Sequence, residues 1–290
     1  MTVRLFVVMV FIGVMIGSPA SSARPTRVRP DSPPEVAHSA AATVPKEKWP
    51  GLAEVDIDFV RPGAEHQTFD QRDHERLAAA VAKNKACSDA LGAGAWDQDV
   101  RRLFYSSAHF DNCAFEEGLA YIDEQLDATN VHIGAQTELN PGVLDDVMYE
   151  LGRTLHGIQD FYSHTNYVEM QSTAGRKPDE IIAIWLPAGR ARLRGLLTNG
   201  LVSGTFLLDG PKRCGAGAKS HAQLAKDTSK MPSGSASVSG WNKDGYTAAL
   251  DLARLASRSF IAYAFNRWPV LAKQCGDVVA FPLIADRRQP

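Results

Sequence analysis

The stretch that decides the fold reads Leu144-Asp-Asp-Val-Met-Tyr-Glu-Leu-Gly-Arg-Thr-Leu-His156-Gly-Ile-Gln-Asp160-Phe-Tyr-Ser-His164. Its apolar residues recur every three or four positions, which is the period of a helix with one buried face. Asn140 and Pro141 precede it, and an N-cap residue followed by proline at the first helical position is a common way for a helix to begin. The sequence therefore predicts a long amphipathic helix over about 144–165.

Three ligand-type side chains stand four residues apart on this helix: His156, Asp160 and His164. Positions i and i+4 lie on one helix face, with Cβ atoms about 6 Å apart, so His156 and Asp160 are placed to bind one ion. His164 is rotated partly off that face and suits a second ion or the edge of a cluster. Nitrogen and carboxylate ligands without sulfur are typical of a catalytic site for Zn²⁺ or a similar cation. The alternative is a polar helix face with unrelated histidines.

A second segment has to complete such a site, because zinc needs three or four ligands and one helix supplies two or three at most. His109 and Asp111 lie in a turn-like stretch between predicted helices, and we expect them beside His156 and Asp160 although about 45 residues separate them. The alternative for Asp111 is a capping role at the next helix. His66 is the upstream candidate that would close the site.

The remaining candidates are weaker. Glu169, five residues past His164, is a possible ligand or base. His74 is expected to be solvated on the polar face of its own helix. His132 has no acidic partner at metal-like spacing.

The N-terminal residues predict export. Residues 1–23 resemble a secretory signal peptide: an apolar run follows Arg4, and small residues suited to cleavage follow the run. The run is shorter than the roughly 20 residues of a membrane span, although an uncleaved anchor is the alternative. Residues 24–50 contain six prolines and no periodicity, which predicts a disordered linker or propeptide. No other segment is apolar enough to cross a bilayer, so we expect a secreted protein, extracellular or periplasmic, with no transmembrane segment in its mature form.

The rest of the chain, 51–290, has the length of one ordinary domain. We predict a mainly α, single-domain helical bundle, because no strand alternation is evident beyond residue 60. Residues 210–240 look like a long surface loop. Besides the long helix already described, helices are expected over about 71–86, 100–105, 115–129, 181–197 with an interruption at Pro187, and 245–268.

Charge and cysteine content restrict the function classes. The formal net charge is -2 at pH 7 and no Lys/Arg cluster stands out, so no nucleic-acid-binding footprint is evident. Four widely spaced cysteines in an exported chain predict two disulfides rather than thiolate metal ligands. Of the three possible connectivities we favour Cys87 with Cys113 and Cys214 with Cys275, because nearer partners close shorter loops.

The segment from Leu151 to Glu169 resembles the most distinctive stretch of the Het-C family, named for a fungal heterokaryon incompatibility protein. That family includes the N-terminal regions of some animal proteins with von Willebrand factor A domains. His109-Phe-Asp111-Asn112 resembles a second stretch of the family, and Gly240-Trp-Asn-Lys-Asp244 more faintly a third. The resemblance covers roughly 60–265 and is strong over 105–170.

The family in turn is similar to zinc-dependent phospholipases C and zinc single-strand nucleases, which are all-α enzymes with a trinuclear zinc site. This similarity implies a ligand role for His109, His156, Asp160 and His164, and His66 would match an upstream histidine. The enzymes also use the amino terminus of a processed Trp, whereas cleavage here would expose Arg24. Their spacing from the helical Asp to the next His is longer than the spacing here.

A later His-x-x-x-Glu pair of these enzymes is a further point of difference. His221 is the only histidine far downstream in this chain, and it is displaced from the family position. We expect one to three zinc ions, and these departures favour one or two.

The resemblance implies a secreted metal-dependent phosphodiester hydrolase of phospholipase C type, whose substrate is a phosphodiester such as a phospholipid. Zinc would lower the pKa of bound water toward about 7 and neutralise charge on the phosphoryl oxygens. Asp111, or else Glu169, would orient the water. Two alternatives stay open: a secreted zinc nuclease, and a noncatalytic metal-binding protein of recognition or toxicity. The sequence carries no signal for an oligomeric state.

Overall fold

The fold was taken from a computed structural model, which describes residues 71–206, 213–215, 217–276 and 278. These residues belong to one compact unit and are mainly helical, so the predicted all-α class is confirmed. The expected signal peptide, the Pro-rich linker and His66 lie outside the described residues. Within the described residues, no helix is both long and apolar enough to cross a membrane.

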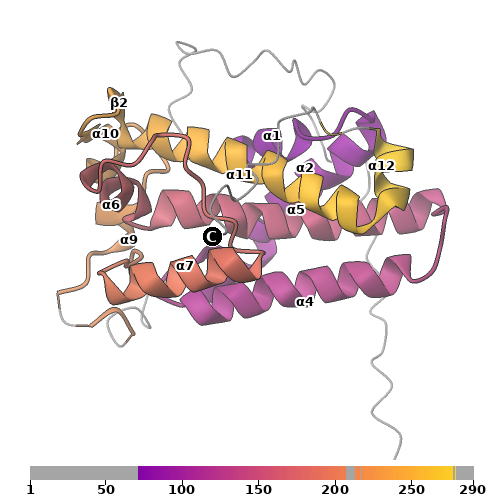
Figure 1. The fold of residues 1–290 in the computed structure, drawn as a ribbon, viewed down its shortest axis with the longest axis horizontal. Coiled ribbons are helices and arrows are strands. Elements are labelled where there is room, and N and C mark those ends of the chain that lie inside the picture. The colour runs from indigo at the N-terminus through magenta and orange to yellow at the C-terminus, as the bar shows by residue number, and fades with distance from the viewer. Residues whose placement is uncertain (1–70, 207–212, 216, 277, 279–290) are drawn as a thin grey trace, which may run out of the picture. The chain divides into compact units, whose positions relative to one another are not determined.

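Helix α5 (Pro141–His164) forms the centre of the fold. It packs against α1 (Gln71–Ala79), α2 (Lys85–Arg101), α4 (Phe115–Ile133) and α11 (Gly245–Arg267). Figure 1 shows α5 running between α4 on one side and α11 on the other. The predicted cap is present: the side chain of Asn140 accepts a hydrogen bond from the backbone N–H of Val143. Every residue from Thr154 to His164 is buried, so the C-terminal half of α5 is enclosed on all sides.

Two glycines allow α2 and α5 to approach closely. A Cβ atom on Gly94 of α2 would lie 2.0 Å from the carbonyl oxygen of Tyr149, and one on Gly152 of α5 would lie 2.1 Å from that of Leu91. Real Cβ atoms do not approach oxygen so closely, since protein interiors are packed to contact. The close packing of α2, which carries Asp99, on α5, which carries His156, Asp160 and His164, therefore depends on the absence of two side chains.

The described chain departs from the predicted helices mainly near its start. The sequence predicted one helix over 71–86, but α1 ends at Ala79 and Asn84 caps a new helix with hydrogen bonds from the N–H groups of Ala86 and Cys87. That helix, α2, extends to Arg101 and includes part of the short helix expected at 100–105. It is rich in Ala and Gly and buried on several sides, so it has no apolar stripe that a periodicity analysis can detect.

The later elements follow the predictions more closely. Helix α4 and helix α11 agree with the segments expected at 115–129 and 245–268. Pro187 is the first residue of α7 (Pro187–Thr198) rather than an interruption within a helix. The further helices are α3 (Ser106–His109), α6 (Tyr167–Thr173), α9 (His221–Leu224), α10 (Pro232–Ser235) and α12 (Pro269–Cys275).

Residues 210–240 were expected to form a long surface loop, and most of the described part is exposed or half-buried, but it contains short helices and a buried stretch. Leu224, Ala225 and Lys226 are buried against the end of α5. A two-residue antiparallel pair, β1 (Ser237–Val238) with β2 (Lys243–Asp244), follows, although no strand was expected here. Glycines and polar residues hid the packing of this segment, because polar side chains such as His221, Lys226 and Asp227 make many of its contacts.

The predicted disulfide pairing was wrong, although two disulfides are present. Cys87 bonds to Cys275 and Cys113 bonds to Cys214, with Cα atoms 5.7 and 5.3 Å apart. The start of α2 lies beside the end of α12, where the backbone N–H of Asn84 donates to the carbonyl of Cys275 at 3.1 Å. Loop-closure entropy grows by only about 0.6 kcal/mol for each doubling of loop length, so helix packing decided the pairing rather than loop length.

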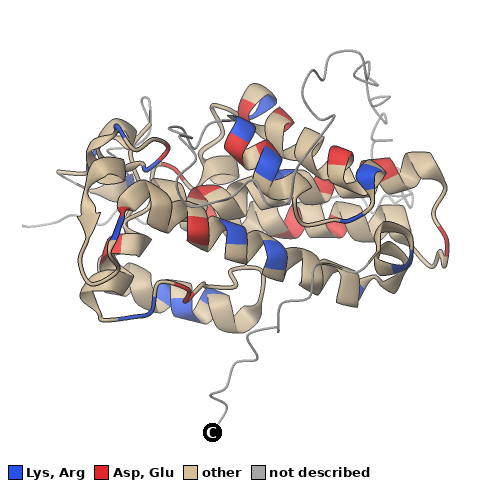
Figure 2. Cartoon of the chain, turned by 90° about the horizontal axis from the view of Figure 1, so that it is seen from above, with Lys and Arg blue, Asp and Glu red and all other residues tan. Residues whose placement is uncertain are grey.

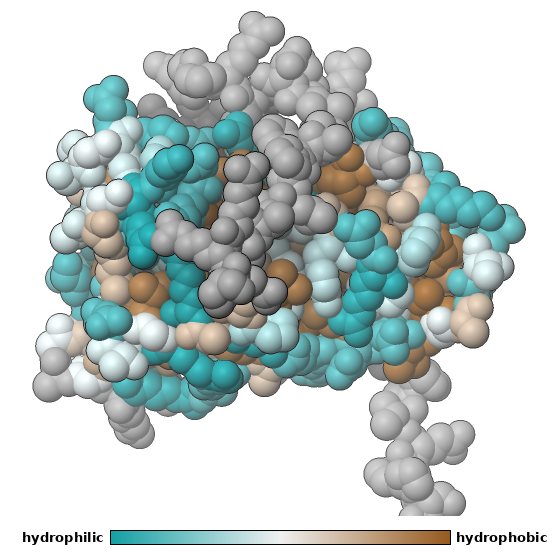
Figure 3. Space-filling view, in the orientation of Figure 1, coloured by the Kyte–Doolittle hydropathy of each residue, from teal (hydrophilic) through white to brown (hydrophobic). Residues whose placement is uncertain are grey.

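Apolar and polar side chains are distributed as expected for a chain with a packed core. In the face shown in Figure 3, the described surface is largely hydrophilic and apolar areas are small and separate. Figure 2 shows acidic and basic positions interspersed along the helices.

The α2–α5 contact gives a stability prediction. Gly152→Ala should destabilise the protein by about 3 kcal/mol, because the added methyl group meets the Leu91 carbonyl and the helices have to separate. Gly195→Ala on α7 is the control: a Cβ atom there meets nothing within 4 Å, so the substitution should stabilise the helix by about 0.5–1 kcal/mol. Urea denaturation of both variants measures the difference, and equal effects would contradict the close-packed contact.

Candidate metal centre

Histidine and aspartate side chains from α1, α2, α3, α5 and the α9 region converge around Asp160. These side chains form three groups. Within each group, one ligand atom per residue lies within 4.8 Å of the ligand atoms of the others, close enough to bind one metal ion. The first group is His74, His156 and Asp160. The second is Asp99, His109 and His156, and the third is Asp111, His164 and His221.

The carboxylate of Asp160 is completely buried and lies between imidazoles on both of its oxygens. Oδ2 is 2.7 Å from His109 Nδ1 and 2.9 Å from His156 Nε2. Oδ1 is 3.1 Å from His74 Nε2 and 3.5 Å from His164 Nε2, and it makes no hydrogen bond in the structure. Asp160 thus joins side chains that otherwise belong to separate groups.

Neighbouring oxygens determine which nitrogen of each imidazole is free to bind a metal. Nδ1 of His156 lies 2.8 Å from the carbonyl oxygen of Ala95, and Nδ1 of His74 lies 2.7 Å from Oε1 of Gln159. An oxygen acceptor at that distance requires a proton on Nδ1, so the lone pair of the neutral imidazole is on Nε2. In the same way, the Arg102 carbonyl at 3.1 Å places a proton on Nε2 of His109 and leaves Nδ1 free. Hydrogen bonds of this kind commonly orient histidine ligands.

These free nitrogens all face Asp160, which is the arrangement that a cation requires. A lone pair and a carboxylate oxygen repel each other unless a proton or a metal ion lies between them. The observed separations of 2.7–3.5 Å bracket the spacing of about 3.3 Å between ligands in a tetrahedral zinc site with bonds of 2.0–2.1 Å. The buried His/Asp groups can therefore hold a metal ion.

The third group lies at the other side of Asp160, and Asp227, an aspartate that the sequence analysis missed, contacts two of its histidines. Nδ1 of His221 is 3.1 Å from Oδ1 of Asp111, and Nε2 is 3.0 Å from Oδ2 of Asp227. Asp227 also reaches Nε2 of His164 at 3.2 Å and accepts a hydrogen bond from the hydroxyl of Ser163. The sequence has no acidic residue four positions after His221, as a His-x-x-x-Glu pair would require. Asp227, six positions after His221, supplies a carboxylate there instead.

A strained turn aims His109 and Asp111 at this centre. Phe110, Asn112 and Cys113 all have φ between 54° and 56°, a region that side chains other than glycine rarely adopt. Each such residue costs on the order of 1–3 kcal/mol and persists only where the surroundings hold it. Here the loop that follows Gly200 packs on the turn and holds it in this conformation.

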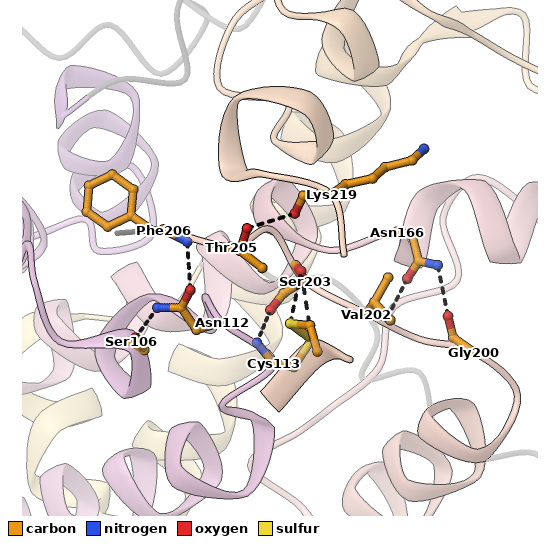
Figure 4. Close-up of a disulfide and its surroundings, with 11 residues drawn as sticks. Ser106, Asn112, Cys113, Asn166, Gly200, Val202, Ser203, Thr205, Phe206 and Lys219 are labelled. Atoms are coloured by element: carbon orange, nitrogen blue, oxygen red, sulfur yellow. Dashed lines mark hydrogen bonds between the residues drawn. A yellow bond between two sulfur atoms is a disulfide. The ribbon is translucent and has the colours of Figure 1, made fainter. Parts of the chain in front are cut away.

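The Cys113–Cys214 disulfide and its hydrogen bonds fasten that loop to the turn (Figure 4). The side chain of Asn112 accepts from the N–H of Phe206 and donates to the hydroxyl of Ser106, both at 2.6 Å. The hydroxyl of Ser203 accepts from the N–H of Cys113 at 2.7 Å. The backbone N–H of His221 donates to the carbonyl of Thr205 in this loop at 2.8 Å, so the same contacts help to place His221 next to Asp111.

Burial and the nearby charges act in opposite directions on the pKa values of the metal-free centre. Burial lowers the pKa of His74, but the Asp160 carboxylate outweighs it and raises that pKa to about 9. For His221, burial and His164 lower the pKa, while hydrogen bonds to Asp111 and Asp227 raise it to about 9 overall. Burial raises the pKa of Asp160, yet the surrounding histidines hold it well below its usual range.

The predicted meeting of the two ligand segments is confirmed. His109 lies 3.2 Å from His156 between ring nitrogens, and Asp111 contacts His164 and His221. The expectation that His74 is solvated was wrong: it is 3 % exposed and borders Asp160. Its helix α1 packs on α2 and α5, so the face that looked polar in sequence points inward.

Asp99 and Asp227 were missed, because neither has helical spacing to a histidine that a single sequence would reveal. Glu169 lies elsewhere than expected: its Oε1 is 3.1 Å from Nζ of the buried Lys226, and among the described residues no contact joins it to the histidines. Its use as a ligand or base finds no support in this arrangement.

Comparison with known proteins gives a partial match. Residues 82–179 match the family of the VWA7 N-terminal domain. This segment includes Asp99, His109, Asp111 and the ligand-type residues of α5, and it excludes His74, His221 and Asp227. No curated protein and no solved structure matches the chain.

The pKa shifts predict how the stability of the metal-free protein depends on pH. A histidine stabilises the fold fully below its unfolded pKa of about 6.5 when its folded pKa is higher, and this contribution is lost as pH rises through the folded value. For His74 and His221, that loss extends up to about pH 9. Asp160 has a depressed pKa, so its contribution is present above about pH 4 and is lost as pH falls.

After chelation, the urea midpoint should therefore fall between about pH 6.5 and 9. When a divalent metal ion such as Zn²⁺ is added, the decline should disappear or reverse, because metal and protons compete for the same nitrogens. A midpoint of the chelated protein that rises across this range would contradict the arrangement of the histidines.

The position of His74 gives a second prediction. His74→Ala should lower the bound metal by at least one equivalent, because it removes one of three ligands from its group. His132→Ala, at an exposed position on α4, is the control and should leave metal content unchanged. Mass spectrometry of the intact protein measures both, and full metal content in His74→Ala would remove this residue from the centre.

Proposed function

We propose that this protein is a secreted, zinc-dependent phosphodiester hydrolase of phospholipase C type. The observation that carries the proposal is the convergence of three ligand groups on the buried Asp160. Adjacent groups that share His156 suit neighbouring ions, and pairs of metal ions are a common device in phosphoryl chemistry. The resemblance to the Het-C family and to zinc phospholipases C supports the same reading.

Zinc is the proposed ion because of the ligand set. The groups contain imidazole nitrogen and carboxylate oxygen, and both cysteine pairs are used in disulfides. Imidazole-rich sites favour zinc over calcium and magnesium, which prefer oxygen ligands alone. Two disulfides also fit an oxidising compartment and so support export.

The residues divide into those that hold the ions and those that hold the ligands. Zinc bound there would act as a Lewis acid on phosphoryl oxygens and make a water nucleophile available near neutral pH. Gln159 and the carbonyls of Ala95 and Arg102 fix the histidine tautomers. Asp111 remains our candidate for orienting the attacking water, since it lies at the partly exposed His221 side of the centre.

The two rival functions have less support. A nuclease that binds single strands uses a basic groove with aromatic platforms, but acidic and basic positions are interspersed on the helices (Figure 2). Phe161, Tyr162 and Tyr167 are fully buried and form part of the core. A noncatalytic metal protein would not need an edge of the centre to stay open, whereas Asp99, His221 and Asp227 retain between 17 and 19 % side-chain exposure.

Asp160→Asn tests the proposal. A neutral amide is a poorer ligand than a carboxylate but has the same shape, so the variant should fold, lose zinc and lose phosphodiesterase activity by more than about a hundredfold. Activity is measured with a soluble nitrophenyl phosphodiester, and zinc is counted in the same samples. The control is Asp251→Asn: Asp251 of α11 pairs with Arg254 of the same helix and with Lys243 of β2, outside the ligand groups.

If the wild-type protein binds zinc yet hydrolyses no phosphodiester, metal binding is supported and the proposed hydrolase activity is refuted. Activity that survives in Asp160→Asn with full zinc content would show that the centre was assigned wrongly.

A further inference from the structure

The loop between α2 and α3 carries apolar side chains that face solvent. Leu103, Phe104 and Tyr105 are 44, 71 and 54 % exposed, and Val100, near the end of α2, is 49 % exposed. In the rest of the described chain, the large apolar side chain of comparable exposure is Val131 on α4. Single exposed apolar residues are ordinary, but a run of adjacent ones marks an interaction site.

This loop is attached directly to the candidate metal centre. The carbonyl oxygen of Arg102 accepts a hydrogen bond from the N–H of Tyr105 at 2.8 Å and lies 3.1 Å from Nε2 of His109. Asp99, whose carboxylate is 3.5 Å from His156 and remains partly exposed, immediately precedes Val100. The apolar loop therefore borders an open edge of the centre.

Two arginines accompany the apolar side chains. The guanidinium of Arg102 lies over the ring of Tyr105, 5.1 Å from its centroid, and Arg101 is exposed and paired with Asp97. Guanidinium groups bind phosphates, and rings with a polar tip favour the boundary between water and acyl chains. Apolar tips flanked by guanidinium groups complement a phospholipid surface, where phosphates lie above the acyl chains.

We propose that residues 100–105 dock the protein on a phospholipid surface. Leu103 and Phe104 enter the boundary of the acyl chains, and Arg102 contacts the headgroup phosphates. A short protruding loop suits a deformable lipid surface, because no preformed groove is needed to receive it. The docked loop holds Asp99 and the metal centre at the depth of the headgroup phosphodiester. This inference rests on the proposed hydrolase function and adds the part of the surface that brings the metal centre to a phospholipid substrate.

Vesicle binding by the full-length protein tests the proposal. Sedimentation with mixed phosphatidylcholine–phosphatidylserine vesicles should show binding that Phe104→Ser weakens about tenfold, the effect of withholding one large apolar side chain from the lipid. Val131→Ser, which removes an even more exposed apolar side chain from α4, should bind as the wild type does. Zinc content and thermal midpoint should be the same in all three proteins, since both positions are on the surface.

Three results would overturn the docking surface. The wild type does not bind the vesicles, the two variants lose binding equally, or Phe104→Ser abolishes a concentration-dependent dimer in vesicle-free solution, which would make the loop a protein interface. Binding is measured without turnover, so it is independent of the enzyme assay. Vesicle binding without phosphodiester hydrolysis would refute the hydrolase activity and support the docking surface. Hydrolysis of a soluble phosphodiester without vesicle binding would support the hydrolase activity and refute the docking surface.

Discussion

The structure depends on one buried carboxylate surrounded by imidazoles. Removing an ionised carboxylate from water costs several kcal/mol unless positive charge accompanies it. Four histidines lie within 3.5 Å of the Asp160 carboxylate, two at each of its oxygens, where they can carry the positive charge that offsets this cost. Because carbonyl and amide oxygens fix the tautomers of three of these histidines, the positive charge has to come from added protons or from metal ions. Binding of metal at this centre should therefore release protons and stabilise the fold together.

The surrounding fold holds ligands that are far apart in the chain at fixed positions. Helix α5 supplies three of them from its enclosed half, and the glycine contact with α2 brings Asp99 toward it. The turn after His109 is held in an unfavourable backbone conformation by the Cys113–Cys214 disulfide and the loop that follows Gly200. Rigid support of this kind fits a site in which an error of about 1 Å changes function.

Much of the fold was predictable from sequence because α5 carries both a helical period and a strong N-cap. The ligands on α5, and the need for the His109 segment, followed from helix geometry and from the number of ligands that zinc requires. Helix α2 was not predictable, since its Ala- and Gly-rich sequence is buried without an apolar stripe. His74 was misjudged because the side of α1 that faces inward is polar. Asp227 and the disulfide pairing depend on how α9, α12 and the loop from Gly200 pack, which local sequence does not specify.

The central claim is that the lone pairs facing Asp160 bind metal ions. X-ray diffraction from crystals of the protein, recorded on both sides of the zinc absorption edge, tests it most directly. The account predicts anomalous peaks within about 2.0–2.2 Å of an Asp160 oxygen and of Nε2 of His74 or His156. A crystal grown with zinc that shows no anomalous peak at Asp160, and in which these imidazoles hydrogen-bond to the carboxylate as protonated donors, would contradict it.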